Sequence, residues 1–367
     1  MTGAEEPAAG AYTARTDLEK TDTARKTEID VAKGLALFTV VLGHVVVLHG
    51  RVSNWILAFH MPAFFFLSGM TFRPERYDTW VQFLKDKWKK RILPYFIIVL
   101  AGFLICMLRP SYRQPVFQDG WRFQLTWILY YTQPINLYVG QAWFLVGLFF
   151  AELFAFIWLR LFGKRHLLMR CYSLLFLALA AVSVRRIDGF LPWGQSLPWK
   201  MDSGLCGAVF LLAGFGAARA DLFSRLRPAA LFLIPVCTWL SYWLGPKLFG
   251  YVNICDCVYS PAPYYYGAAF MGIAALVLTA VLLRNSRFWQ FAGRLTLPLF
   301  AMQTFAIYLV IEAVEKITGM AYMPMELMPG TKECLLIAAA AFGLMLLAVL
   351  PWYFYKREKL HKKYRTK

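Results

Sequence analysis

Long apolar runs separated by short polar loops fill the chain from Ile29 to residue 355. The runs are close to 20 residues long, and a helix of that length crosses the ~30 Å hydrocarbon layer of a bilayer. They are too numerous to be core helices of one soluble domain. The pattern predicts an all-α polytopic membrane protein with about ten transmembrane helices. The predicted spans are 29–49, 54–72, 92–108, 141–161, 167–184, 202–219, 228–245, 264–284, 294–315 and 333–355.

Polar segments flank this membrane region at both ends. Residues 1–28 contain no apolar core of a cleavable signal peptide, so we expect a disordered cytoplasmic tail there. Residues 29–355 form the predicted membrane domain, and residues 356–367 form a basic cytoplasmic tail.

The net charge becomes informative once it is sorted by loop. The formal net charge is +18, although charged residues make up only 16% of the chain. With the N-terminus inside, the inner loops and tail hold 23 Lys and Arg, whereas the outer loops hold 10. Cytoplasmic loops are enriched in these residues, so the bias places both termini in the cytoplasm. The positive charge therefore indicates a multi-pass protein of the cell inner membrane and gives no reason to expect nucleic-acid binding.

The segment 73–91 mixes aromatic residues with lysines between two predicted spans. This composition is typical of an amphipathic helix that lies on the inner leaflet, where basic residues attract anionic lipids. The same basic platform could instead attract a phosphorylated substrate, and the two interpretations can coexist.

Three polar residues interrupt the first predicted span. Lys33 and His44 are eleven residues apart, which at ~100° per residue places them on one helix face, roughly 16 Å apart along the axis. Asp30 lies one turn before Lys33 on nearly the same face. Charged side chains in lipid are costly, so we expect this stripe to face a dry cleft inside the helix bundle.

A second histidine lies in the next span. His60 is about as far below the connecting turn as His44, so the two imidazoles should lie at similar depth. A lone buried histidine is often only an inter-helix hydrogen bond, but a neutral imidazole can also act as a general base. Ser68 and Gly69, near the end of the span, fit either close helix packing or close approach of a ligand.

Further polar residues have a structural and a functional interpretation. Gln141, Trp143 and Tyr138 could hold a sugar at the outer mouth or pack at the interface. Glu152 is an intramembrane carboxylate, hence a candidate site residue or a structural partner. Asp202 lies near a span end, where we expect it to be solvated.

Cys255 and Cys257 share one predicted outer loop. A disulfide to another segment and a zinc site both remain open, although a C-x-C spacing is tighter than usual for zinc. We predict no metal site and no permanently bound cofactor.

Four motifs carry a resemblance to a known family. In chain order they are "IDVAKGLALFTVVLGHVV", "FHMPAFFFLSGMTF", "KKRILPY" and "AWFL". In this order the chain resembles the acyltransferase-3 superfamily of integral membrane enzymes, and within it the fucose 4-O-acetylase-like branch. The resemblance implies about ten spans and transfer of an acyl group, often acetyl, from cytoplasmic acyl-CoA to a carbohydrate hydroxyl. Lys33 and His44 match the family's basic residue and histidine on the first span.

The chain departs from the family pattern in a late span. Gln303 stands where related proteins often have a histidine, and Gln can form hydrogen bonds but cannot take up a proton. This departure puts the identity of the acceptor in doubt. Gln303 is therefore a candidate acceptor-binding residue rather than a catalytic one.

Together, these observations predict a membrane O-acyltransferase with His44 as general base and His60 orienting it or contacting the oxyanion. Lys33 and Arg91 are expected to bind the phosphates of the co-substrate acyl-CoA, with Asp30 and Ser68 at the same donor site. Gln141, Trp143, Glu152 and Gln303 are the candidates for a carbohydrate or glycan acceptor. Membrane lipids are the other expected partners, and the oligomeric state stays open. The alternative is an exporter of a polysaccharide or lipid-linked sugar without such chemistry.

Overall fold

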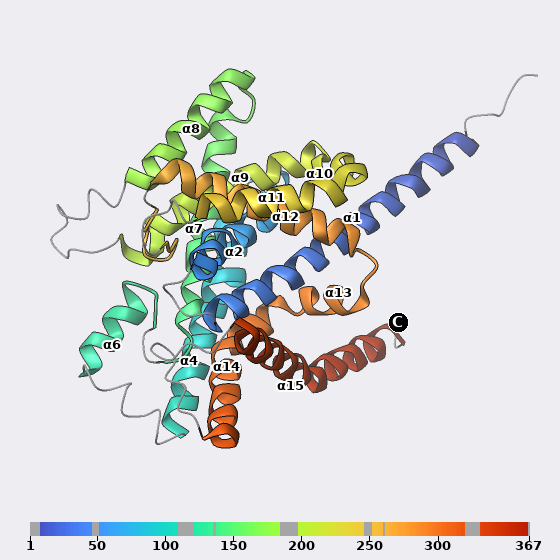
Figure 1. The fold of residues 1–367 in the computed structure, drawn as a ribbon. Coiled ribbons are helices and arrows are strands. Elements are labelled where there is room, and N and C mark those ends of the chain that lie inside the picture. The colour runs from blue at the N-terminus through green and yellow to red at the C-terminus, as the bar shows by residue number, and fades with distance from the viewer. Residues whose placement is uncertain are drawn as a thin grey trace, which may run out of the picture.

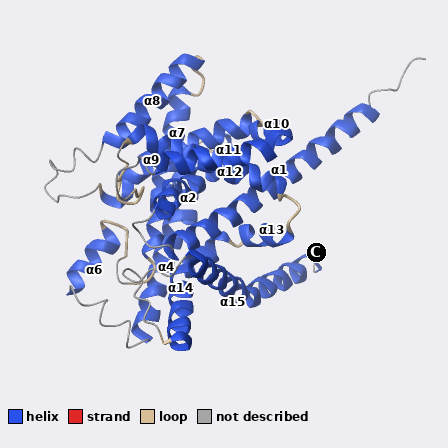
Figure 2. Ribbon diagram, in the orientation of Figure 1, coloured by secondary structure: helices blue, strands red, loops and turns tan. Residues whose placement is uncertain are grey.

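The computed structural model describes the backbone of residues 8–45, 51–108, 120–134, 137–183, 197–245, 252–259, 261–319 and 331–365. Side chains are described over the same ranges except 8–26, 51, 331 and 356–365. Regular structure within these ranges is helical, as predicted, and the described part contains no β-strand (Figure 2). An isolated antiparallel bridge joins Asn253 to Val258.

The first half of the chain forms helices that coincide with the predicted spans and adds short helices between them (Figure 1). They are α1 (Ala8–Val45), α2 (Arg51–Met70), η1 (Pro74–Arg76), α3 (Trp80–Lys87), the π-helical turn η2 (Trp88–Ile92), α4 (Leu93–Leu108), α6 (Gly120–Leu129), η3 (Gly140–Ala142), α7 (Trp143–Phe162) and α8 (Leu167–Ser183).

The second half continues in the same way. Its helices are η5 (Pro198–Lys200), α9 (Met201–Arg219), α10 (Leu222–Leu226), η6 (Arg227–Ala229), α11 (Ala230–Leu244), α12 (Ala262–Leu282), α13 (Arg287–Arg294), α14 (Thr296–Thr318) and α15 (Thr331–Arg365).

Seven helical segments in the described ranges are long and apolar enough to cross a membrane. They include α2, the continuous helix Trp80–Leu108, and the helices around α7, α9, α12, α14 and α15. The predicted spans over α1, α8 and α11 are also helical, but α8 and α11 have only 17 and 15 residues. The chain is thus a multi-pass membrane protein, and the count of ten stays a prediction.

The predicted tails differ in how far the structure describes them. The backbone is helical from Ala8 onward, so much of the tail predicted to be disordered over 1–28 continues α1. The side chains of 1–26 and of the basic tail 356–367 lie outside the described residues.

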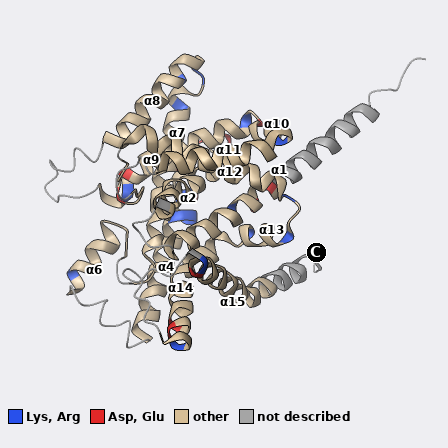
Figure 3. Ribbon diagram, in the orientation of Figure 1, with Lys and Arg blue, Asp and Glu red and all other residues tan. Residues whose placement is uncertain are grey.

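Helix α2 packs centrally against α1, α9 and α12, and α9 packs in turn against α7. Glycines allow these helices to cross closely: a Cβ on Gly69 would clash with the Leu211 carbonyl, and one on Gly214 with the Phe66 carbonyl. Lys and Arg lie mostly at helix ends and in loops, whereas the ribbons inside the bundle carry few charges (Figure 3). The few charges inside the bundle therefore stand out.

Candidate active site

Helices α1 and α2 bring His44 and His60 to the same level. A Cβ on Gly43 of α1 would lie only 3.0 Å from Cγ2 of Ile56 in α2, so the helices meet closely at this point. His44 follows Gly43 directly, and the His60 ring contacts the backbone carbonyl of Ile56. The two imidazoles are near enough to interact electrostatically. The common depth predicted from the connecting turn is confirmed.

The His60 ring is held in one orientation. Its Nδ1 lies 2.8 Å from the Ile56 carbonyl oxygen, and the side chain is only 5% exposed. Because a carbonyl oxygen can only accept, Nδ1 must carry the proton and donate. The other ring nitrogen, Nε2, then presents a lone pair and can accept a hydrogen bond.

The surroundings of His44 combine an accessible side chain with dense enclosure by protein atoms. Its side chain is exposed, whereas Leu37 and Val40, on the same face of α1, are at most 1% exposed. Protein atoms nevertheless surround His44 densely. The imidazole of His44 is therefore accessible at its exposed side. His60, at 5% exposed, is the more buried of the two side chains.

At the predicted cytoplasmic end of α1, two cations converge. The half-buried Lys33 ammonium is within electrostatic range of Arg91, which lies in the π-helical turn η2. Asp30, also near Lys33, accepts a hydrogen bond from Arg294 of α13 at 3.1 Å from Nε to Oδ2. Asp30 is thereby tied to α13, and the structure brings Lys33 and Arg91 together as the donor-binding hypothesis requires.

Glu152 of α7 forms a buried ion cluster with two cations of the η2 region. Arg91 donates to both carboxylate oxygens, with Nε 3.1 Å from Oε2 and Nη2 2.9 Å from Oε1. The Nζ of Lys87 lies 3.0 Å from Oε1, and Glu152 is only 2% exposed. This geometry supports the structural interpretation of Glu152. Arg91 forms no described bond through Nη1, so those N–H donors can still bind a ligand phosphate.

Lys87 is the residue of this site that the sequence analysis missed. We placed 73–91 on the membrane surface, but α3 continues through η2 into α4 as one helix. Lys87 therefore turns inward, is 6% exposed, and lies 5.1 Å from the ring centroid of Phe72. Phe83, fully buried one turn earlier on the same face, was the signal that could have revealed it.

Gln141 and Trp143 serve packing between α7 and its neighbours. The Gln141 amide donates to the carbonyls of Phe300 and Ala301 at 3.2 and 3.3 Å, and it accepts from Thr304 at 3.0 Å. Trp143 is 6% exposed. For both residues the structure supports the packing interpretation, and a role in holding a sugar stays a prediction.

Gln303 differs from Gln141, whose amide is fully paired. Its side chain is 0% exposed, yet neither Nε2 nor Oε1 has a hydrogen-bond partner among the described residues. Leaving such an atom unsatisfied costs about 1–3 kcal/mol. Gln303 lies on α14, which packs against α1.

A family model of the acyltransferase domain known as acyltransferase-3 matches residues 26–356, nearly the whole chain. The chain belongs to the acyltransferase-3 family. It is therefore a membrane acyltransferase that transfers groups other than amino-acyl groups. A search of curated proteins finds no match. The fucose 4-O-acetylase-like branch stays a prediction.

Ser68 of this acyltransferase lies where α2 and α9 cross. The neighbouring Gly69 meets the backbone of Leu211, which supports close helix packing for the Ser–Gly pair. The Ser68 carbonyl accepts hydrogen bonds from Thr71. A direct contact of Ser68 with the acyl donor stays a prediction.

A second polar cluster lies at the start of α9. Asp202 is 1% exposed rather than solvated, because its carboxylate accepts from the backbone N–H groups of Ser203 and Leu197 at 2.7 and 3.2 Å. Cys255 and Cys257 are buried free thiols, and burial raises the pKa of the Cys255 thiol. No group of three metal-ligating side chains occurs within the described ranges.

Proposed function

We propose that this acyltransferase moves an acyl group, acetyl in the leading case, from cytoplasmic acyl-CoA to a hydroxyl of a carbohydrate or cell-surface glycan. The reaction would take place in the cell inner membrane, as the resemblance to the fucose 4-O-acetylase-like branch implies. The observation that carries the proposal is the histidine pair: an accessible imidazole, His44, beside a buried one whose orientation the backbone fixes.

The donor enters from the cytoplasmic end. Lys33 and the Nη1 group of Arg91 bind the CoA phosphates, with Lys33 acting as a point charge and Arg91 as a planar donor. Lys33 and His44 lie roughly 16 Å apart along α1, a span that the extended pantetheine arm can bridge. The thioester then lies near His44.

His44 acts as the general base. It takes the proton from the acceptor hydroxyl as the oxygen attacks the thioester carbonyl, the C–S bond breaks, and the CoA thiolate recovers the proton from His44. Of the two roles considered for His60, orientation is favoured over contact with the oxyanion. Its single N–H already donates to Ile56, so its Nε2 can only accept, and a His44 N–H is the nearby donor.

The acceptor contacts Gln303. Hydroxyl groups of a sugar can both donate to Oε1 and accept from Nε2, and thereby satisfy the amide atoms that have no partner in the described part of the chain. Glu152 holds Lys87 and Arg91 in place.

A transfer assay separates this function from export without chemistry. Purified protein in liposomes is given labelled acetyl-CoA together with envelope glycan from cells that lack the protein, and the glycan is analysed by mass spectrometry. We expect acetyl groups on the glycan and a matching release of free CoA. Movement of glycan across the liposome membrane with no loss of thioester would contradict the proposal and favour the exporter.

A further inference from the structure

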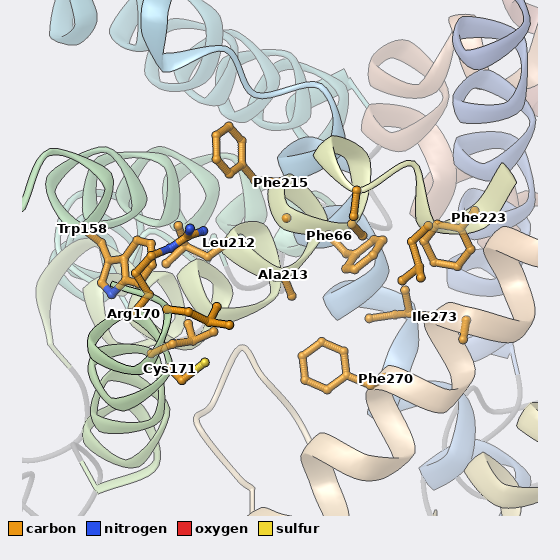
Figure 4. Close-up of a pocket in the computed structure, with 17 residues that line it drawn as sticks. Phe66, Trp158, Arg170, Cys171, Leu212, Ala213, Phe215, Phe223, Phe270 and Ile273 are labelled. Atoms are coloured by element: carbon orange, nitrogen blue, oxygen red, sulfur yellow. The ribbon is translucent and has the colours of Figure 1, made fainter. Parts of the chain in front are cut away.

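An apolar pocket lies between α7 and α8, and neither His44 nor His60 lines it (Figure 4). Its volume is about 490 Å³, and helices α2, α7, α8, α9, α10 and α12 contribute to its wall. Ligand pockets in proteins typically range from about 300 to 1,000 Å³. The lining is mostly aromatic and aliphatic, with phenylalanine rings of Phe66, Phe223 and Phe270 around one end (Figure 4).

Two hydrogen-bond donors at the other end of this pocket lack a partner. Nε of Arg170 and Nε1 of Trp158 are both buried, and neither finds an acceptor within the described part of the chain. Trp158 is 8% exposed, and both residues line the same end of the cavity (Figure 4). An acceptor supplied by a ligand would satisfy both, so the pocket is built for an apolar molecule that ends in an oxygen-rich group.

The charge around this end favours an anion. Lys164 and Arg165 lie in the short connection just before α8, and α7 and α8 hold no acidic residue beyond Glu152, while the exposed Asp221 lies between Ala220 and Leu222 of the lining. The nearby Arg219 already pairs with Glu75. The pocket also lies at the end of the bundle that the charge bias places at the cytoplasmic leaflet, where anionic lipids gather.

Helix α8 makes the pocket accessible from lipid. It is the outermost wall, since it packs on α9 and α7 while large apolar side chains on its other face are exposed, among them Leu168 at 71% and Phe176 at 74%. In a membrane that exposed face lies against acyl chains. A lipid can therefore enter laterally without passing through water.

We propose that this pocket binds one anionic phospholipid of the inner leaflet. An acyl chain would lie among Phe66, Phe223 and Phe270, and the phosphate oxygens would accept hydrogen bonds from Arg170 and Trp158. The alternatives fit less well: the nucleotide of acyl-CoA or a peptide backbone needs many polar partners, and this lining offers few. The inference is independent of the acyl donor and acceptor.

Native mass spectrometry of the purified full chain tests the proposal, with phosphatidylglycerol and phosphatidylcholine as the probes. We expect the parent protein to retain one phosphatidylglycerol and to prefer it over phosphatidylcholine at least fivefold. Arg170→Gln should abolish that preference. Arg122→Gln is the matched control, because it removes the same charge from an exposed residue of α6, which does not line the pocket, and should keep the preference.

A second variant keeps the test decisive if Arg170→Gln does not fold. Trp158→Phe preserves the ring and removes only the donor, so it should weaken retention severalfold without a change in the unfolding temperature of the lipid-free protein. Equal retention of both lipids by the parent, or undiminished preference in both variants, would overturn the proposal. Displacement of the lipid by free glycerol phosphate would also overturn it, since the site would then recognise only the anion.

Discussion

Buried polar groups are paired differently at the two ends of the first transmembrane helix. Near Lys33, the buried carboxylate of Glu152 is matched by Arg91 and Lys87 at hydrogen-bonding distance. Beyond Lys33 the polar groups are neutral and incompletely paired: His60, beside His44, has one described hydrogen bond, and Gln303, on the neighbouring helix α14, has no partner within the described ranges. In this comparison the buried charged side chains lie at the Lys33 end, where opposite charges neutralise them.

This difference distinguishes residues that stabilise the fold from residues that take part in the proposed reaction. A paired buried charge cannot move without leaving its partner unsatisfied, so the Glu152 cluster fixes α7 against the η2 region. A neutral imidazole with a free lone pair and an unpaired amide can instead change partners when substrate arrives. The comparison predicts that substitutions in the Glu152 cluster reduce stability, whereas substitutions of unpaired or accessible polar groups reduce activity.

Removal of the Glu152 carboxylate should have the largest effect. Glu152→Ala leaves Arg91 and Lys87 as uncompensated buried charges, and breaking such a pair costs about 3–5 kcal/mol. The free energy of unfolding in detergent should fall by that amount. Lys90→Gln is the control, because it breaks an exposed pair with Asp86 on the adjoining turn and should cost at most about 1 kcal/mol. Similar losses in both variants would contradict the scaffold role.

A substitution of the buried histidine should affect activity more than stability. His60→Phe keeps an aromatic ring but removes the lone pair that orients His44, and we expect kcat to fall by about 10²-fold. A positioning residue acts through its partner, so the double variant with His44→Ala should be no slower than His44→Ala alone. Multiplicative losses in the double variant would show that the two histidines act independently.

Loss of the inner cation should affect donor binding. Lys33→Gln removes one charge from the CoA phosphate site, so the KM for acyl-CoA should rise about tenfold with a smaller change in kcat. Added salt should narrow the difference between parent and variant, since it screens the same interaction. An unchanged KM would remove Lys33 from the donor site.

The smallest effect is expected at Gln303. Gln303→Leu deletes two amide atoms that lack partners in the described structure, so the unfolding temperature should stay the same or rise. The KM for the glycan acceptor should increase a few-fold, while the KM for acyl-CoA stays constant. A drop in stability would show that Gln303 has a structural partner, and would remove it from the acceptor site.

The sequence predicts the helices and the histidine pair well, because both depend on local periodicity. The length of each apolar run predicts where a helix lies. The equal distances of His44 and His60 from the connecting turn predict that they lie at the same depth. Local periodicity does not predict contacts between residues that are far apart in the sequence. Glu152 lies 65 residues from Lys87 and 61 from Arg91. Lys87 was assigned to the membrane surface and Asp202 to solvent, whereas both side chains are buried.

The accessibility of His44 also depended on packing that one helix cannot reveal. Helical spacing placed it on the same face as Lys33, and from this we expected a dry cleft. The structure shows an exposed side chain above a fully buried stretch of that face. A general base must be reached by its substrate, so this accessibility agrees with the role proposed for His44.

Acyl transfer by a His44→Ala variant tests the central claim most directly. Transfer from labelled acyl-CoA is compared at equal membrane abundance with the parent and with His166→Ala, which removes an exposed histidine in the α7–α8 connection. The account predicts a loss of about 10²-fold or more for His44→Ala and parental activity for His166→Ala. Transfer by His44→Ala within about threefold of the parent would contradict it, because loss of a general base cannot leave the rate nearly intact.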